Sequence, residues 1–196
     1  SEMLDGATFE TLKIPYAAVA TDLNTAEEVV FRKGDLTKAI RASISVPAIF
    51  QPISYDDRLL ADGWLSNPVP DKIVRDMGSD IVIAVNLDHF YTPEVSVQSA
   101  SLAKIPMHSI EILRHNLALN SIRTADIIIA PKLPQVGLVG WNYFFNGDKA
   151  QEIIKAGEDA AIEAMPTIQA LIQSNMRGRS IRHKFHTFFN KLRDRS

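Results

Sequence analysis

Asp62 is the residue whose surroundings best fit a chemical role. It ends an apolar run and directly precedes Gly63, in the stretch LLADGWLSNPVP over residues 59–70. α/β proteins place reactive groups at the carboxyl ends of their strands, and a carboxylate there can accept a proton from a nucleophile held nearby. Gly63 would let the backbone approach closely or adopt a positive φ. Because Asp-Gly is also a very common turn, the dipeptide alone leaves a plain turn open.

Other familiar chemistries find little support in the sequence. The absence of cysteine excludes disulfides, a thiolate nucleophile and a cysteine-based zinc site. None of the five histidines falls in a Ser/His/Asp or metal-ligand spacing. We therefore interpret them as surface or packing residues and expect no metal ion and no organic cofactor. The five are His89, His108, His115, His183 and His186.

Three polar residues near the motif are given structural roles. Ser43 and Ser45 lie on a predicted helix rather than on a sharp turn, and no base is spaced to activate them, so packing or capping is expected. Arg41 is expected to be a structural ion-pair partner. The aromatic run Trp141–Phe145 is interpreted as core, although it could also form a lip for lipid chains.

Composition sets the class of protein. A chain of 196 residues suits one domain with a sizeable core. Its net charge of −2 gives no general attraction to nucleic acid, which we do not expect as a partner. No apolar stretch approaches the 18 residues of a membrane span, and the first ten residues do not resemble a signal peptide. Together with the lack of cysteine, this favours the cytoplasm, with contact at a membrane surface left open.

Strand-like and helical patterns alternate along the chain, which predicts an α/β fold with a mainly parallel central sheet covered on both faces. A hairpin turn is predicted at Asp56-Asp57, with Arg58–Ala61 as the return strand. Asp35 is predicted to cap the helix over 36–44, and Gly78 to end the helix over 70–77. The predicted strands are Ile14–Thr21, Glu28–Lys33, Ser79–Leu87 and Ala125–Pro131, and the predicted helices are 36–44, 70–77, 105–121 and 148–173.

Two of these segments carry predictions about burial. The continuous apolar run Ser79–Leu87 is typical of a strand that a parallel sheet buries on both faces. In the helix over 105–121, Ile110, Leu113, Leu117 and Leu119 are expected to contact the core.

The last 23 residues differ from the rest in charge. Residues 174–196 hold seven Lys or Arg residues and one acidic residue, Asp194, and Ile181, Phe185, Phe188, Phe189 and Leu192 recur at helical spacing. A basic helix with an aromatic face can lie on an anionic membrane. It can equally pack its rings on the domain and leave its charges in solvent. We therefore predict a domain over residues 1–173 and a basic amphipathic tail over residues 174–196.

Several motifs taken in order resemble the patatin-like phospholipase family. They are AVATDLNTAEEVVFRKGDLTKAIRASISVPAIFQPI, then LLADGWLSNPVP, then MGSDIVIAVNL. The later segments ADIIIAP, VGLVGW and AGEDAA match in the same order. The resemblance covers roughly Thr8 to Leu171, and the motifs are specific when taken jointly.

This resemblance implies a three-layer α/β/α fold and a lipid acyl hydrolase that works with a Ser–Asp dyad and no histidine. The serine of a G-x-S-x-G turn would attack the ester carbonyl, and Asp62 would orient and deprotonate it. Backbone N–H groups of a Gly-rich loop would stabilise the oxyanion. Such a carboxylate needs a desolvated or preorganised setting, because an aspartate at its ordinary pKa is a weak base.

The sequence departs from the family pattern in two respects. It contains no G-x-S-x-G and no Gly-rich oxyanion loop, both of which precede the ATDL strand in the family, so we expect a fold that is incomplete at its N-terminal side. Trp64 also stands where the family usually has Gly or Ala.

The prediction is a phospholipase or esterase domain acting on lipids or other acyl esters, in which this chain supplies Asp62 alone and is inactive by itself. The alternative is a non-enzymatic, degenerate module that serves as a membrane- or partner-binding platform.

Overall fold

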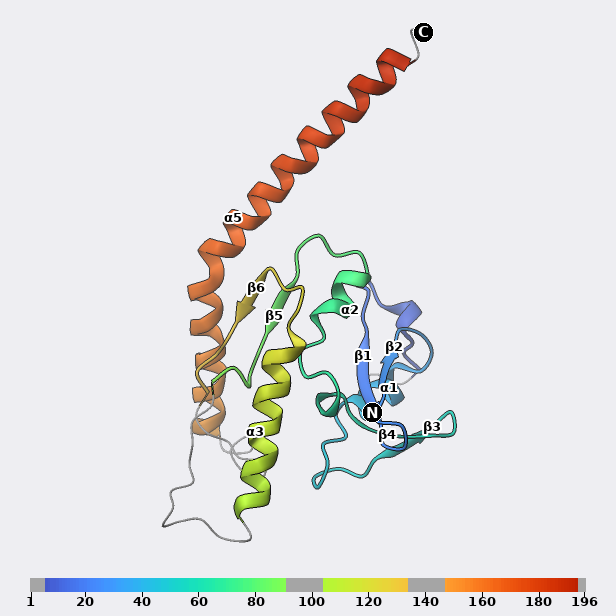
Figure 1. Cartoon of the computed structure of the whole chain (residues 1–196), viewed down its shortest axis with the longest axis vertical. Helices are drawn as coiled ribbons and strands as arrows, with labels where there is room; N and C mark the ends of the chain where they lie inside the picture. The colour runs from blue at the N-terminus through green and yellow to red at the C-terminus, as the bar shows by residue number, and fades with distance from the viewer. Residues whose placement is uncertain (1–5, 91–103, 134–146, 194–196) are drawn as a thin grey trace.

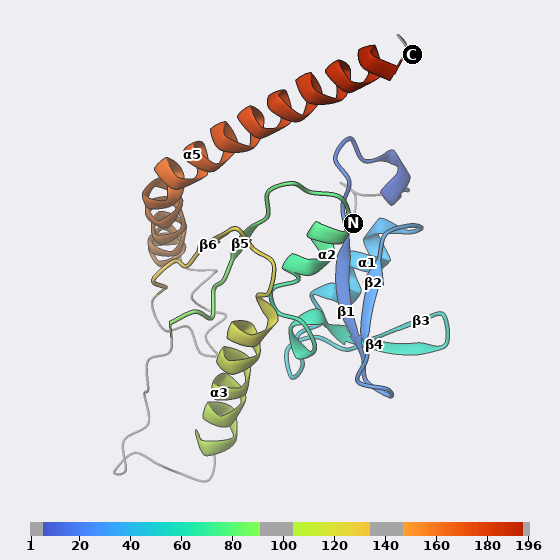
Figure 2. The same ribbon diagram turned by 45° about the horizontal axis from the view of Figure 1, so that its top comes forward.

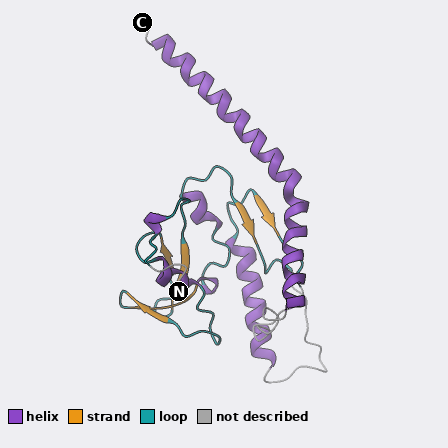
Figure 3. Cartoon of the chain, turned by 180° about the vertical axis from the view of Figure 1, so that it is seen from behind, coloured by secondary structure: helices purple, strands orange, loops and turns teal. Residues whose placement is uncertain are grey.

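The described strands form two separate sheets, joined by helices (Figures 1 and 3). The structure is a computed structural model that describes residues 6–90, 104–133 and 147–193, with the backbone alone for residues 104, 107 and 177–193. The larger sheet has the order β2-β1-β4-β3 and the smaller one pairs β5 with β6. The chain is thus a mixed α/β protein, as predicted.

The larger sheet is built from two hairpins. β1 (Ala18–Asp22) pairs with β2 (Glu28–Phe31), and β3 (Ile53–Tyr55) pairs with β4 (Arg58–Asp62). The β3–β4 turn is the predicted Asp56-Asp57, whose φ angles of 47° and 60° are those of a two-residue type I′ turn. β4 then lies against β1.

All three pairings in this sheet are antiparallel, so the prediction of a mainly parallel sheet is wrong for the described strands. The reason is the length of the connections: five residues between β1 and β2, and two between β3 and β4, are too few for a parallel crossover. Only β5 (Ile83–Val85) and β6 (Ile127–Ile129) pair in parallel.

The main core lies between the larger sheet and α1 (Leu36–Ser43). Asp35 caps this helix, as predicted, by accepting a hydrogen bond of 3.0 Å from the N–H of Lys38. Every residue of β1 is buried, which places it at the centre of the sheet. The short helix η2 (Phe9–Thr11) closes one side of the cluster. The cluster consists of Phe9, Ala18, Ala20, Phe31, Leu36, Ala39, Ala42 and Leu60.

A second, smaller core joins the parallel strands to the helices around them. α2 (Asp71–Asp76) ends before Gly78, whose φ of 96° marks the predicted stop. Ala118 of α3 (Lys104–Ser121) packs with Ala84 of β5 and with Val69. In Figure 2, α3 lies below α2 and the parallel strands, with its C-terminal end toward them.

Asp71 ties this unit together. Its buried carboxylate accepts hydrogen bonds from the backbone N–H groups of Arg123, Thr124 and Ala125, just before β6. Burial by itself would raise the pKa of Asp71, but these backbone donors outweigh that effect and hold the pKa below its ordinary value. One carboxylate thus anchors the start of α2 to the segment that enters β6.

The burial predictions for this region are partly wrong. Ile83, Val85 and Leu87 are 41%, 53% and 58% exposed, so one face of β5 is not covered by the described residues. On α3, Leu113 and Leu119 are also exposed and the fully buried residue is Ala118, whereas Ile110 and Leu117 are half-buried. The close approach of α3 to β5 explains the choice of the small side chain.

The last helix, α5 (Gly147–Arg193), spans 47 residues and contains Pro166. It begins beside β6, and its distal half extends away from the rest of the described chain (Figures 1 and 2). The helix continues through residue 173, and the proposed boundary between domain and tail stays a prediction. The run Trp141–Phe145 and the side chains of the five apolar tail residues lie outside what the structure describes.

Candidate functional site

Asp62 is the last residue of β4 and the residue that caps the short helix η3 (Gly63–Leu65). It pairs with Ala20 of the buried central strand. Its Oδ1 accepts a hydrogen bond of 3.0 Å from the N–H of Trp64. The aspartate therefore stands at a strand end that leads directly into a helical turn.

The backbone of Asp62 is held on both sides. Its N–H donates to the carbonyl oxygen of Ser45 at 3.0 Å. Its carbonyl oxygen accepts a hydrogen bond of 2.9 Å from the hydroxyl of Thr21, and that hydroxyl also lies 2.8 Å from the Ser66 hydroxyl. Because Thr21 and Ser45 both hydrogen-bond to the main chain of Asp62, the carboxylate has little positional freedom.

Gly63 makes this arrangement possible. A Cβ at position 63 would lie 2.4 Å from the carbonyl oxygen of Val19 and 2.8 Å from its carbonyl carbon. The expected role of Gly63 is thus confirmed in one of its two forms: it allows a close backbone approach, and its φ is not positive.

The electrostatic environment of Asp62 suits proton transfer. Burial raises the pKa of the Asp62 carboxyl above its ordinary value, and the hydrogen bond from the Trp64 N–H only partly offsets this. Within the described part of the chain, Oδ1 has the Trp64 donor and Oδ2 has no hydrogen-bond partner. A half-buried carboxylate with a raised pKa and a free oxygen can act as a general base.

Ser45 and Arg41 have structural roles. Ser45 is fully buried, and its hydroxyl donates to the carbonyl oxygen of Arg41 at 2.6 Å while accepting from the Arg41 guanidinium. The packing role predicted for Ser45 is confirmed. The expected ion pair of Arg41 is replaced by hydrogen bonds to Ser45 and to the carbonyl oxygen of Gln51, and by a position 5.4 Å from the Phe50 ring centre.

Sequence reasoning did not single out Thr21, Ser66 or the Ser45 carbonyl as supports of Asp62. Thr21 precedes Asp62 by 41 residues and Ser45 precedes it by 17, whereas Ser66 follows it by four. No local sequence pattern connects these residues with Asp62. One signal was present: Thr21 is a polar residue in a strand that is otherwise apolar up to that point.

None of the histidines whose side chains the structure describes contacts Asp62. His115 Nδ1 lies 2.7 Å from the carbonyl oxygen of Asp88, and His108 Nδ1 lies 3.4 Å from Glu111 Oε2. His89 packs edge-on against Phe90. Among the described residues, no three His, Asp or Glu side chains are grouped so as to hold a metal ion. The side chains of His183 and His186 lie outside what the structure describes.

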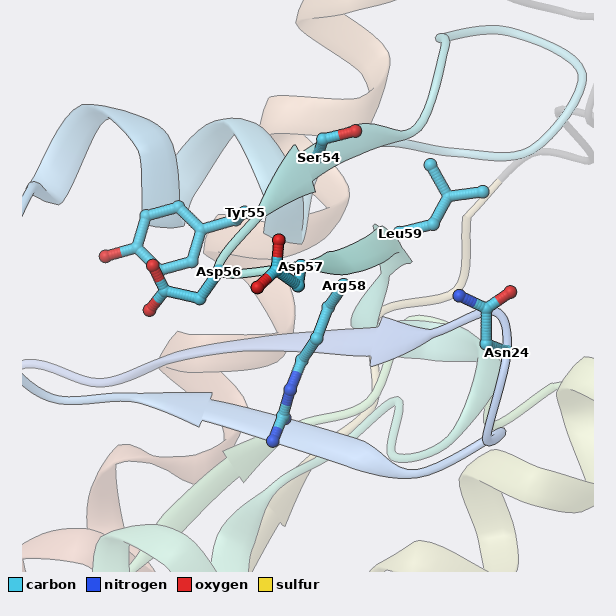
Figure 4. A pocket seen from close by; sticks show the side chains of 7 residues that line it. All are labelled: Asn24, Ser54, Tyr55, Asp56, Asp57, Arg58 and Leu59. Carbon is cyan, nitrogen blue, oxygen red and sulfur yellow. The ribbon is translucent and has the colours of Figure 1, made fainter.

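A hollow of about 320 Å³ lies on the β3–β4 hairpin, lined by Asn24, Ser54, Tyr55, Asp56, Asp57, Arg58 and Leu59 (Figure 4). Figure 4 shows the Arg58 side chain crossing toward β1 and β2, where its Nε lies 4.0 Å from Asp22 Oδ2. Asp62 does not line this hollow. The candidate carboxylate and the hairpin hollow are therefore separate features.

No helix in the described part of the chain combines the length and apolar character needed to cross a bilayer.

The chain is similar to known proteins in its first part above all. Residues 1–74, which include β1 to β4 and Asp62, match the sequence model of the patatin-like phospholipase family. The resemblance found in the sequence is confirmed over this range.

Individual relatives give the same result. An uncharacterized NTE family protein of Mycobacterium bovis is 42% identical over 87 residues, which cover 44% of this chain and 24% of that protein. A second NTE family protein of the same organism is 23% identical over 181 residues, covering 81% of this chain and 30% of that protein. The mouse patatin-like phospholipase domain-containing protein 7 is 33% identical over 89 residues, 7% of its length. The chain thus spans about a quarter of the length of the first of these relatives.

Proposed function

Because residues 1–74 carry the patatin-like phospholipase pattern, we propose that this chain is the aspartate-bearing part of a lipid acyl hydrolase. Asp62 is the general base of a Ser–Asp dyad, and its substrates are carboxylic esters of lipids. The observation that carries the proposal is the state of the Asp62 carboxyl: fixed at a strand end, half-buried, raised in pKa, and free at Oδ2 within the described residues.

The reaction needs a serine hydroxyl that this chain does not supply, since it contains no G-x-S-x-G. Asp62 takes the proton of that hydroxyl while the serine oxygen attacks the ester carbonyl. The proton then passes to the departing alcohol, which leaves an acyl-serine. In the second half, Asp62 takes a proton from water, the hydroxide attacks the acyl-serine, and the proton returns to the serine oxygen as the fatty acid leaves.

The fixed main chain supports this role. A base must stay within hydrogen-bond reach of the hydroxyl that it deprotonates, and small displacements of a catalytic group lower the rate strongly. Ser45, Thr21 and Gly63 hold the Asp62 backbone where it is. The absence of a histidine beside Asp62 in the described residues is compatible with a two-residue mechanism.

The test is ester hydrolysis by the natural full-length protein that contains this chain. We expect hydrolysis of a p-nitrophenyl ester and of a phospholipid, and a loss of about a hundred-fold or more in kcat with Asp62→Asn, the range of general-base catalysis. Asp57→Asn is the matched control: it removes the same charge from the same sheet, at the exposed hairpin turn. The assignment of Asp62 as the base fails if Asp62→Asn retains full activity. Asp62-dependent ester hydrolysis by residues 1–196 alone would overturn the separate claim that this chain does not supply the nucleophile.

A second candidate is a non-enzymatic platform that binds membranes through residues 174–196. It is favoured by the basic composition of this segment and by the extension of α5 away from the rest of the described chain (Figure 1). We expect anionic vesicles to sediment the full chain and not a chain that ends at residue 173. Equal sedimentation of the two would remove this candidate and leave the hydrolase proposal unaffected.

A further inference from the structure

The α5 helix exposes a row of large apolar side chains. Its members are 42–69% exposed, so the described residues leave much of each one uncovered. Steps of eight, three, seven and four residues bring them back to one face of the helix. An apolar row of this kind marks a surface that another molecule covers. We call it the α5 stripe, and it consists of Ile154, Ile162, Met165, Ile172 and Met176.

The spacing within the stripe suits a second helix. From Ile162 to Met176, with Gln169 included, the intervals are three, four, three and four, which is the seam of two helices that pack along each other. A polar residue at one seam position, such as Gln169, lowers the stability of a helix pair but helps to fix its alignment. Pro166 is not among the seam positions.

The charges of α5 are divided along its length. Residues 147–176, which we call the acidic half, hold five Asp or Glu residues and two Lys residues, a net charge of −3. Residues 177–193, the basic half, hold six Lys or Arg residues and no acidic residue. Asp159 already pairs with Lys155 at 2.8 Å. A surplus of negative charge is left in the acidic half even when each lysine is matched to an acid.

The two halves of one helix cannot neutralise each other. Charged side chains on a helix meet partners three or four positions away, whereas Glu163 and Arg177, the nearest opposite charges across the boundary, are 14 positions apart. That is about 20 Å along the axis, compared with a Debye length of about 8 Å at physiological ionic strength. Figures 1 and 2 show the end of α5 extending away from both sheets, so no described element lies beside the basic half.

We propose that α5 pairs with the α5 of a second copy of this chain, side by side and in opposite directions. This arrangement covers the stripe of each helix with that of the other and places each acidic half along the basic half of the other copy. A parallel pair would set like charges beside each other, which is unfavourable. The proposal concerns association alone and does not depend on Asp62 acting as a base.

An anionic membrane is the alternative cover for the stripe, and the position of the stripe argues against it. All five stripe residues lie within the acidic half, which an anionic bilayer repels. A membrane attracts the basic half but leaves the stripe uncovered. A second α5 meets both requirements at once, because it brings an apolar stripe together with a basic half.

The first test is the mass of the chain, measured by analytical ultracentrifugation over a series of concentrations. We expect a reversible dimer that weakens at higher salt, because salt screens the exposed charges. A chain that stays monomeric at its highest soluble concentration would overturn the proposal.

The second test reverses the charge of the acidic half. The variant Glu158→Lys, Asp159→Lys, Glu163→Lys changes its net charge from −3 to +3 and should weaken dimerisation about ten-fold or more, because attraction becomes repulsion. A matched control makes the same change at three exposed acids outside α5 and should dimerise as the parent chain does. Equal losses in variant and control would overturn the pairing in favour of a general effect of net charge. The control is Glu27→Lys, Asp57→Lys, Asp76→Lys.

Rescue by mixing makes this test specific. A basic-half variant should also be monomeric where the parent chain dimerises, because its two halves are both acidic. Mixed in equal amounts, the acidic-half and basic-half variants offer opposite charges again, so we expect a heterodimer. A mixture that stays monomeric, while each variant keeps the circular dichroism spectrum of the parent, would overturn the proposal. The basic-half variant is Arg177→Glu, Arg179→Glu, Arg182→Glu, Lys184→Glu.

The third test reads the direction of pairing in chains that keep their native charges. The sequence has no cysteine, so Gln151→Cys and Asn190→Cys each give a single site for a fluorescent label, near opposite ends of α5. An antiparallel pair brings residue 151 of one copy near residue 190 of the other and keeps two labels at residue 151 about 60 Å apart. We expect strong energy transfer between the two different sites and weak transfer between two Gln151→Cys chains. The reverse result would overturn the antiparallel direction, and no transfer in either mixture would overturn the pairing.

Anionic vesicles distinguish the two covers for the stripe. A dimer that forms without lipid supports the pairing. A chain that is monomeric without lipid, and whose acidic-half variant binds anionic vesicles more tightly than the parent chain, would identify the stripe as a membrane surface and overturn the pairing. Ester hydrolysis is not measured in these experiments, so their failure would leave the hydrolase proposal untouched.

Discussion

Gly63 lies against the carbonyl group of Val19 so closely that a Cβ at position 63 would sit 2.4 Å from the Val19 oxygen. This contact presses the residue after Asp62 onto the central strand. The glycine of the Asp-Gly pair is therefore required by packing between two main chains, and the turn that carries the carboxylate cannot be displaced without moving β1.

Gly63→Ala is expected to destabilise the fold by about 1–3 kcal/mol or more, because backbone atoms cannot move aside as a flexible side chain can. Denaturant unfolding followed by circular dichroism measures this. Gly157→Ala, on α5 with nothing within 4 Å of the added carbon, is the control and should be neutral or slightly stabilising. Similar losses at both positions would contradict the packing argument.

Thr21→Val should cost about 0.5–1.5 kcal/mol, the net value of a typical hydrogen bond, because it removes the donor to the Asp62 carbonyl oxygen and keeps the shape of the side chain. Thr21→Ser keeps the hydroxyl and should recover most of the hydrogen-bond contribution. The check is thermal unfolding of both variants together with the amide shift of Gly63. If Thr21→Ser falls as far as Thr21→Val, the hydroxyl is not what holds this strand end.

Asp71→Asn should destabilise the fold at neutral pH by about 1.5–3 kcal/mol, since the buried carboxylate accepts three backbone hydrogen bonds. The folded-state pKa of Asp71 is lowered, so its stabilisation is present above the unfolded-state pKa and is lost as the pH falls through the folded-state value. The difference between parent and variant should shrink in acid. Asp76→Asn, which removes an exposed pair with Lys72, should change stability by less than about 1 kcal/mol, and a larger effect there would argue against the buried clamp.

Asp62 should show the opposite pH dependence. Its folded-state pKa is raised, so its contribution to stability is fully present below the unfolded-state pKa and is lost as the pH rises through the folded-state pKa. Asp62→Asn removes this titration and should flatten the decline over that interval. Denaturant unfolding at a series of pH values provides the comparison. An unchanged pH profile in Asp62→Asn would mean that the carboxyl is solvated as in the unfolded chain.

Local patterns in the sequence were enough to find most elements of the larger sheet. Asp35 as a helix cap and Asp56-Asp57 as a hairpin turn have specific backbone chemistry, and the structure has both. Asp62 could also be placed at a strand end. The pattern could not predict the direction of strand pairing, because a buried apolar strand has the same sequence pattern in parallel and antiparallel sheets. The short connections within the two hairpins make their strand pairs antiparallel.

The contacts that support Asp62 and the ion pair between Asp88 and Arg114 cannot be found from such local patterns. Thr21 reaches Asp62 across 41 positions, and Asp88 meets Arg114 across the segment between β5 and α3. These contacts depend on how β1 packs beside β4 and how α3 lies on β5. The exposure of one face of β5 could not be predicted for the same reason. Its apolar run predicts burial, but burial also requires neighbouring elements that pack against that face.

Pro166 stands in the interior of α5. Its ring removes one backbone donor and clashes with the carbonyl of Ile162, so a helix kinks at such a residue. Both views show α5 changing course along its length (Figures 1 and 2). The kink at Pro166 thus sets the direction in which the arginine- and lysine-rich end of α5 extends away from the sheets.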